Sequence, residues 1–295
     1  MHVYLNATSY EGPLEEGNSH AQIFLDEAHT AWVVKSVTSS RLGITHGRAL
    51  FNEFVATRVA ELLGLPVPQV AIMAVDDPLL NAFPELRTPA SGSFSAGLHL
   101  ATRYHQGITL RAFRTAGVPE LAQRKVINKL DANGVVTFDT WLCNPDHADE
   151  TELGLYENEG NLLFETTRPG ELRLMMLDHG QAFTGDWHDR ADGDPVRRLG
   201  SWPTRLMGHY EVFVRGRWLN VTSCVEWLAQ IQKVTLADLK RIVNEVPAAW
   251  REEIPEGEVE KLLLYLLVRA TTIEKIVYQE FATMPERLRR GVTHP

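Results

Sequence analysis

The sequence predicts an α+β protein in two parts, in which a strand-rich N-terminal part precedes a mostly helical C-terminal part. Short apolar runs bounded by turn residues dominate the first part, and apolar residues at helical spacing dominate the second. Strands and helices do not alternate strictly along the chain, which argues against a doubly wound sheet. The chain contains neither a Walker-type phosphate loop nor Gly-x-Gly-x-x-Gly, so a bound nucleotide would need another kind of site.

In the first part, a helix is expected over residues 48–63, because its apolar residues recur at helical spacing and Gly64 follows as a C-terminal cap. Pro66 and Pro68 then favour an extended chain. Residues 76–95, rich in Pro, Gly and Ser, are expected to form a loop or a partly ordered connection. The expected strands are residues 21–25, 31–37, 70–75 and 99–104.

In the second part, two strands at residues 161–164 and 172–177 are expected to flank a turn that contains Gly170. Thr235 and Asp238 offer the chemistry of a helix start. The expected helices are residues 119–130, 135–143, 223–232, 236–246 and 259–281.

Composition limits the classes of function. With 44% hydrophobic and 23% charged residues, the chain is typical of a globular protein, and its net charge of −9 argues against direct binding of nucleic acid. The two cysteines, Cys143 and Cys224, provide no disulfide framework. The N-terminus does not resemble a signal peptide, and the longest apolar run, residues 262–268, is shorter than the ~20 residues of a membrane span. We therefore expect a cytoplasmic protein without a membrane span.

Lys35 ends an apolar strand, and Glu53 lies on the helix that follows. A lysine in this position can reach the α- and β-phosphates of ATP if a carboxylate holds it in place. The alternative interpretation is a lysine that protects the edge of a sheet.

Asp146 directly follows Asn144 and Pro145 at the end of an apolar helix. An aspartate on such a loop can accept or orient the proton of a substrate hydroxyl. The alternative is an ordinary turn, in which Asn, Pro and Asp are common.

Asp178 lies between an apolar strand and Gly180. A carboxylate at the end of a strand suits a magnesium ion shared with phosphate oxygens, although a purely structural aspartate would also fit. Lysine, catalytic acid and metal ligand follow one another in the order used by kinases. His147 and His188 also lie beside aspartates, but no His-x-x-x-His spacing supports a transition-metal site.

Several blocks in order resemble the HipA-like kinase domain. They are Trp32-Val33-Val34-Lys35, Asn52-Glu53, Leu63-Gly64-Leu65-Pro66-Val67-Pro68, Asn144-Pro145-Asp146, Gly160-Asn161-Leu162-Leu163-Phe164 and Leu177-Asp178-His179-Gly180-Gln181-Ala182-Phe183. The resemblance extends from about His20 to Phe183 and more loosely into the helical end. It implies a two-lobed protein-kinase-like fold, with an N-lobe at residues 1–103 and a C-lobe at residues 104–295.

The resemblance also implies roles for single residues. Lys35 would hold the ATP phosphates, Glu53 would position Lys35, Asp146 would be the catalytic aspartate, and Asp178 would bind magnesium. Residues 17–20, which include Ser19, lie where the family has its phosphate-covering loop and would contribute to nucleotide binding. The hinge beside adenine would fall near residues 99–104.

The catalytic loop departs from the family pattern. Where the family has Asp-Arg-His-x-x-Asn, with the asparagine as a second metal ligand, this chain has Thr151. An insertion over residues 148–159 would explain the difference and leave Asn161 as the metal ligand. This acidic insertion is expected near the active site, where it would present extra carboxylates, repel an acidic substrate or gate access.

The resemblance implies an ATP- and Mg²⁺-dependent kinase, and by analogy a protein serine/threonine kinase with an antitoxin or regulator as a possible partner. One alternative is a pseudokinase that binds nucleotide without turnover. Another is a kinase for a small molecule or lipid. Self-modification is expected at hydroxyls near the phosphate site: Ser19, Ser36, Thr38, Ser39 and Ser40.

Overall fold

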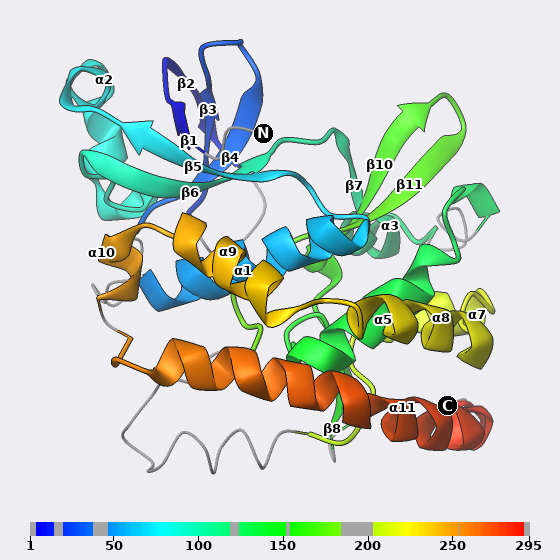
Figure 1. The fold of residues 1–295 in the computed structure, drawn as a ribbon. Helices are drawn as coiled ribbons and strands as arrows, with labels where there is room; N and C mark the ends of the chain where they lie inside the picture. Colours follow the sequence, from blue (N-terminus) through cyan, green and yellow to red (C-terminus); the bar gives the residue numbers. More distant parts are fainter. Residues whose placement is uncertain are drawn as a thin grey trace.

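The computed structural model describes residues 4–14, 20–37, 47–118, 124–151, 154–183, 203–252 and 254–291. Several residues singled out in the sequence lie outside the described residues: 17–19, which include Ser19, and Thr38, Ser39, Ser40 and His188. The α+β organisation is confirmed: a six-stranded sheet near the N-terminus stands above a helical body (Figure 1).

The six-stranded sheet has the strand order β1-β5-β6-β4-β3-β2. Its strands are β1 (Tyr4–Asn6), β2 (Ser9–Pro13), β3 (Gln22–Leu25), β4 (Ala31–Lys35), β5 (Val70–Val75) and β6 (Gly97–Arg103). β1 runs parallel to β5, and the other neighbours are antiparallel. The sequence predicted the four inner strands but not β1 and β2, which lie at the two edges.

Side chains along β4 alternate between a buried face and a face that lines a cleft. Trp32 and Val34 are buried in a small core on one side of the sheet. Because successive side chains point to opposite faces, Val33 and Lys35 point the other way and line a cleft. The apolar run that predicted a strand therefore also determines where Lys35 points.

Residues 76–95 are more ordered than expected. They form α2 (Asp77–Ala82) and two 3₁₀ turns, Pro84–Arg87 and Pro89–Ser91. The Asp76 carboxylate accepts from the Leu79 amide at 2.9 Å and caps the helix. Leu80, Leu86 and Phe94 belong to the small core that contains Trp32 and Val34. The expectation of a loop was wrong because the apolar residues between the prolines have a buried surface to cover.

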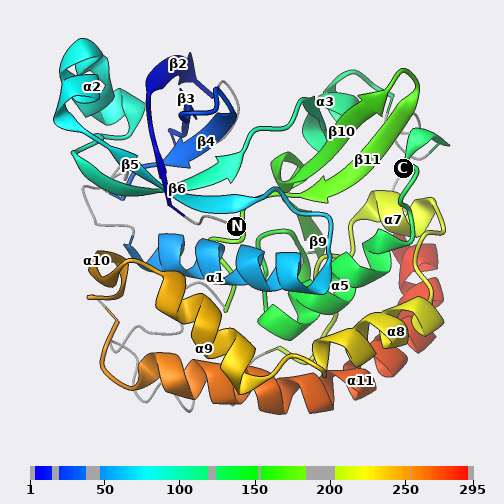
Figure 2. The same ribbon diagram turned by 45° about the horizontal axis from the view of Figure 1, so that its top comes forward.

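Helix α1 (Gly47–Leu63) packs beneath the other face of the sheet and against α9 (Leu236–Glu245) and α10 (Ala248–Arg251), as Figures 1 and 2 show. Phe54 meets Trp250 edge-on at 6.3 Å between ring centroids, and Arg58 pairs with Glu245 at 2.9 Å. A Cβ on Gly47 would lie 3.2 Å from the Trp250 carbonyl oxygen, closer than most side chains approach their neighbours, so the start of α1 packs tightly against α10. The C-terminal helices therefore hold α1 in place.

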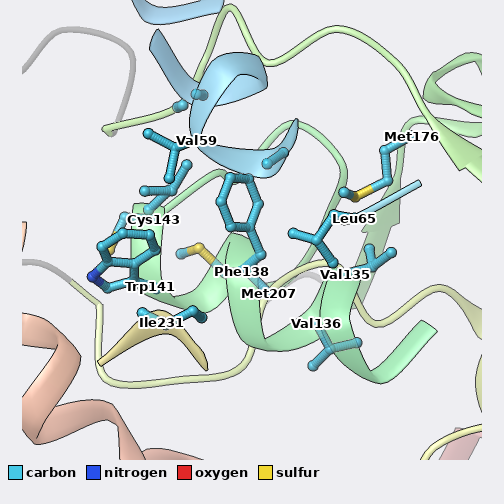
Figure 3. Packing of buried hydrophobic residues seen from close by; sticks show 14 of the residues in the cluster. Val59, Leu65, Val135, Val136, Phe138, Trp141, Cys143, Met176, Met207 and Ile231 are labelled. Atoms are coloured by element: carbon cyan, nitrogen blue, oxygen red, sulfur yellow. The ribbon is translucent and has the colours of Figure 1, made fainter. Parts of the chain in front are cut away.

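The helical body forms around α5 (Asp131–Leu142), whose side chains are almost all buried. In Figure 3 Phe138 and Trp141 of α5 pack among aliphatic and sulfur-containing side chains from several elements. The Trp141 indole donates to the Leu266 carbonyl oxygen at 2.8 Å, which ties α5 to the last helix. The other helices are α3 (Leu110–Thr115), α7 (Glu211–Arg215), α8 (Val221–Ile231) and α11 (Glu258–Gly291). Among the described helices, none has the length and apolarity that crossing a bilayer requires.

Two smaller sheets lie beside the helical body. β7 (Gly107–Thr109), β10 (Leu162–Arg168) and β11 (Glu171–Met176) form one, and β8 (Ala148–Thr151) with β9 (Gly154–Glu157) forms a hairpin. The helix expected over residues 119–130 ends earlier than expected: residues 124 and 125 are helical, and the residues after them are not. Val126 forms a bridge with Leu172, and the turn that follows leads into α5.

Candidate active site

A cleft of about 1320 Å³ lies between the six-stranded sheet and the helical body. Residues far apart in the sequence line it, among them Lys35, Glu53, Tyr104, Asp146, Asn161 and Asp178. All six were expected at the site from the sequence: Tyr104 as part of the hinge, Asn161 as a metal ligand, and the other four as catalytic, nucleotide-binding or metal-binding residues. The cleft is large enough for a ligand of the size of a nucleotide.

Lys35 joins two elements of the cleft. Its Nζ lies 2.7 Å from Oε2 of Glu53 on α1 and 2.9 Å from Oδ2 of Asp178. The lysine and Glu53 side chains are 15% and 4% exposed, whereas Asp178 is 37% exposed. One cation thus faces two carboxylates, and the more accessible of the two points into the cleft.

Burial and charge act differently on these three groups. Burial alone would lower the pKa of Lys35, but the Asp178 and Glu53 carboxylates raise it, so the ammonium stays charged. Burial raises the pKa of Glu53 to about 7 despite the attraction of Lys35. Burial also opposes ionisation of Asp178, but Lys35 lowers the pKa of that carboxyl overall. Asp178 therefore remains the firmly ionised partner.

The segment after Asp178 is fixed to α1. Asp178 has a backbone φ of 55°, a left-handed conformation that is uncommon for a residue with a side chain. The Asn52 side-chain amide of α1 donates to the carbonyl oxygens of Gly180 at 3.3 Å and Ala182 at 3.1 Å. These bonds satisfy carbonyls that the sharp turn leaves outside a sheet.

Asp146 lies in the loop directly after the C-terminus of α5. The helix ends at Cys143 in the left-handed conformation, with φ 50°, and Pro145 cannot continue it. Three neutral donors point at the Asp146 carboxylate. The Asn161 and Asn158 amides donate to Oδ2 at 2.9 and 3.2 Å, and the Tyr156 hydroxyl lies 3.4 Å from Oδ1.

The insertion expected at residues 148–159 is the β8–β9 hairpin and its exit. Despite this detour, Asn161 returns to the catalytic loop, because its amide contacts Asp146 directly. Asn158 was not predicted as a site residue. Its position two residues before Gly160, inside a segment interpreted only as an acidic insertion, concealed it.

The acidic residues of the hairpin are mostly paired with arginines. Arg114 lies 2.7 Å from Glu157 and also pairs with Glu159 and Glu211. Asp149 receives two bonds from Arg205, at 2.6 and 2.5 Å. The expectation that these residues present extra carboxylates to the site is therefore wrong for Asp149, Glu157 and Glu159, whose charges are compensated within the fold.

His147 and Asp139 form a buried pair that the sequence did not reveal. His147 Nδ1 lies 2.9 Å from Asp139 Oδ2, while Nε2 lies 2.8 Å from the Leu177 carbonyl oxygen and 3.0 Å from that of Asp178. Both ring nitrogens face acceptors, so both carry protons. Burial would lower the pKa of His147, but Asp139 raises it to about 9. An aspartate on the buried face of an apolar helix was the available signal.

The His147–Asp139 pair connects the loop that contains Asp146 to the loop that contains Asp178. His147 is the chain neighbour of Asp146 and donates to the carbonyl of Asp178, so one imidazolium fixes both loops. His179 also lies in this buried cluster, and its ligand atom and those of Asp139 and His147 are within 4.8 Å of one another. A metal ligand must be a neutral imidazole with a free lone pair, so the protonated His147 does not suit a metal there.

The oxygen atoms around the cleft suit a hard cation instead. Asp178 offers a partly exposed carboxylate, and Asn161 offers an amide oxygen beside Asp146. Carboxylate and amide oxygens are the protein ligands that Mg²⁺ prefers. The residues present therefore fit the magnesium ion that the family resemblance implies.

The fold and this cleft define a phosphotransferase of the protein-kinase-like class, and comparisons with known proteins agree. A family model described as HipA-like kinase matches residues 11–194, which is more than half of the chain. The chain belongs to the HipA-like kinase family.

A solved structure supports the fold. A Helicobacter pylori proinflammatory kinase, CtkA, superposes with a TM-score of 0.56 at 13% identity, over 95% of this chain and 98% of the other. A Golgi casein kinase with Mn and ADP bound is similar with a TM-score of 0.49 at 12% identity, over 92% of this chain and 73% of the other. Among curated protein sequences, none matches this chain. The predicted protein-kinase-like fold is confirmed.

Proposed function

We propose that this protein is an ATP- and Mg²⁺-dependent kinase that transfers the γ-phosphoryl group to a serine or threonine hydroxyl of a protein. The observation that carries the proposal is the convergence of Lys35, Asp146, Asn161 and Asp178 on one cleft from four separate segments. The lobes at residues 1–103 and 104–295 would enclose the nucleotide between them. Serine or threonine specificity is supported only by membership of the family.

The roles of the residues follow from their surroundings. Lys35, held by Glu53 and Asp178, would bind the phosphates of the nucleotide as a fixed cation. Asp146 would orient the acceptor hydroxyl and take its proton. Asn161 and Asp178 would hold the magnesium ion, which when bound neutralises the charge on the phosphate oxygens. Such preorganised charges are the main source of catalysis in phosphoryl transfer.

The direct contact between Asn161 and Asp146 favours turnover over nucleotide binding alone. A pseudokinase was the alternative suggested by the altered catalytic loop, because Thr151 replaces the expected asparagine. With Asn161 at 2.9 Å from Asp146, the amide required by the family is supplied from beyond the hairpin.

The test is Mg²⁺-dependent transfer of labelled γ-phosphate from ATP to proteins of a bacterial lysate. Asp146→Asn, which keeps the shape of the side chain, is the control. Label that requires both Mg²⁺ and Asp146 supports the proposal. Binding of ATP without transfer by either protein would instead indicate a pseudokinase. Transfer only to a small-molecule or lipid fraction would replace the protein substrate with one of these.

A further inference from the structure

Tyr156 on β9 lies at the carboxylate proposed to take the acceptor proton. Its hydroxyl lies 3.4 Å from Oδ1 of Asp146, whereas the amides of Asn158 and Asn161 donate to Oδ2. The two oxygens of Asp146 thus have different neighbours. Oδ1 is the oxygen that faces a hydroxyl group, and this hydroxyl belongs to the protein itself.

The backbone that follows Tyr156 is anchored by two hydrogen bonds, and the side chain of the next residue is held by an ion pair. The backbone N–H of Asn158 donates to the His147 carbonyl oxygen at 2.9 Å, and the Tyr210 hydroxyl donates to the backbone carbonyl oxygen of Asn158 at 3.2 Å. Arg114 holds Glu157 at 2.7 Å. The Tyr156 side chain itself lines the cleft and is 49% exposed. A fixed backbone with an accessible side chain presents the phenol to the cleft in a limited set of positions.

A cation stands beside the phenol. Arg111 of α3 lines the same cleft and is close enough to Tyr156 for an electrostatic interaction. Its guanidinium approaches Gly160, where a Cβ would lie 3.3 Å from Arg111 Nη2. Arginine forms strong charge-assisted hydrogen bonds to phosphate. A phosphate on Tyr156 would therefore have a cation within reach.

We propose that Tyr156 is a phosphoacceptor of the protein's own active site, modified within the same molecule; the inference rests on the proposed kinase function. The phenolic oxygen forms a bond to the γ-phosphorus of a nucleoside triphosphate. The bond from that phosphorus to the β–γ bridging oxygen breaks, and its electron pair leaves with the nucleoside diphosphate. The phenolic proton passes to Oδ1 of Asp146. Phosphotyrosine at this position covers Asp146 and blocks other acceptors.

The experiment uses the full chain with ATP and Mg²⁺, with site-resolved mass spectrometry as readout. We expect one phosphate on Tyr156, with a rate constant that does not change on tenfold dilution of the protein. Tyr156→Phe and Asp146→Asn abolish this modification. Tyr278→Phe, which alters a tyrosine of similar exposure on α11, leaves it unchanged.

The outcomes separate the inference from the proposed function. ADP formation or label on lysate proteins, with Tyr156 unmodified, overturns the inference and leaves the kinase standing. A rate constant that falls with dilution overturns modification within one molecule. If no variant and no wild-type protein consumes ATP, both proposals fail.

A second readout does not need turnover. In protein labelled with 3-fluorotyrosine, the ¹⁹F signal of Tyr156 is assigned by its loss in Tyr156→Phe. Mn²⁺ with a non-hydrolysable ATP analogue should broaden the Tyr156 signal, because the phenol lies beside the residues proposed to hold the metal, and leave the Tyr278 signal sharp. A Tyr156 signal that Mn²⁺ and the analogue leave sharp contradicts the proposed position of the hydroxyl.

Discussion

Asp178 and Asp146 face the same cleft but are held in opposite ways. A lysine ammonium lies 2.9 Å from Asp178, whereas the carboxylate of Asp146 receives two neutral amides and lies near a neutral hydroxyl. Lys35 compensates the charge of Asp178 and lowers the pKa of its carboxyl against the effect of burial. The donors around Asp146 orient its oxygens without neutralising its charge.

The difference shows how one cleft can separate two tasks. A carboxylate paired with a cation remains ionised and suits a lasting contact with metal and phosphate. A carboxylate oriented by amides and a hydroxyl keeps its charge available for a passing proton. Substitutions of Asp146, of the partners of the two aspartates and of the hairpin that precedes Asn161 can separate these two tasks.

The largest effect is expected from Asp146→Asn. The amide cannot take a proton, so transfer should slow by about 10²–10⁴-fold, the usual contribution of a general base. Nucleotide affinity should change little, because Lys35 and Asp178 are untouched. Steady-state kinetics with a thermal-shift titration of ATP would check both points. A variant that retains full activity would remove Asp146 from the mechanism.

Lys35→Met tests the other side of the comparison through stability. It leaves the buried Glu53 and the ionised Asp178 without their shared cation, which should cost about 3 kcal/mol of the free energy of unfolding. Urea denaturation measures this cost. Lys35→Arg, which keeps the charge, should recover most of it. An unchanged unfolding midpoint in Lys35→Met would mean that the ion pairs are not formed in solution.

Arg114→Met tests whether the hairpin positions the donors of Asp146. It frees Glu157, Glu159 and Glu211 from their common partner and should cost about 1–2 kcal/mol of stability. It should also raise the Mg²⁺ concentration needed for activity, because Asn161 follows the hairpin. Arg87→Met is the matched control, since its exposed pair with Asp77 should contribute less than about 1 kcal/mol. Equal effects of the two substitutions would remove the special role of Arg114.

Asn158→Ala is expected to have the smallest effect. It removes one bond of 3.2 Å to Asp146, worth about 1 kcal/mol, and should lower the turnover rate by a few fold. The Mg²⁺ dependence should stay as in the wild type, whereas Asn161→Ala should shift it. Activity measured over a series of Mg²⁺ concentrations distinguishes the two asparagines. A shift in Asn158→Ala instead would exchange their proposed roles.

Local patterns in the sequence were sufficient for much of the fold. The periodicity of residues 48–63 located α1, and Thr235 with Asp238 forms the predicted capping interaction at the start of α9. The family blocks predicted that Lys35, Glu53, Asp146, Asn161 and Asp178 would lie in one site, and all five line the same cleft. The alternation in β4 explains why Lys35 points into it. These features depend on neighbours in the chain or on motifs, which a single sequence displays.

Features that depend on distant partners were not predictable in this way. β1 is a strand because it pairs with β5, and its own short sequence carries little signal. The acidic residues near Glu157 suggested an insertion that presents extra carboxylates to the active site, repels an acidic substrate or gates access. Nothing nearby in the sequence indicated that Arg114 would pair with them. Asp139 and His147 are separated by a full helix end, and only the fold reveals their pairing.

The packing of α1 has a consequence for local opening. This helix supplies Glu53 and Asn52 to the site, and its apolar residues belong to the same buried cluster as those of α5 and α11. Separating Glu53 from Lys35 by unfolding α1 would therefore expose the main core of the protein. Amide hydrogens in the middle of α1 should exchange with solvent only through global unfolding, whereas those of the largely exposed strand β9 should exchange through smaller fluctuations. Opening the contact between Lys35 and Glu53 thus requires unfolding of the whole protein. The β8–β9 hairpin beside Asp146 is the part of the site that can change locally when a substrate binds.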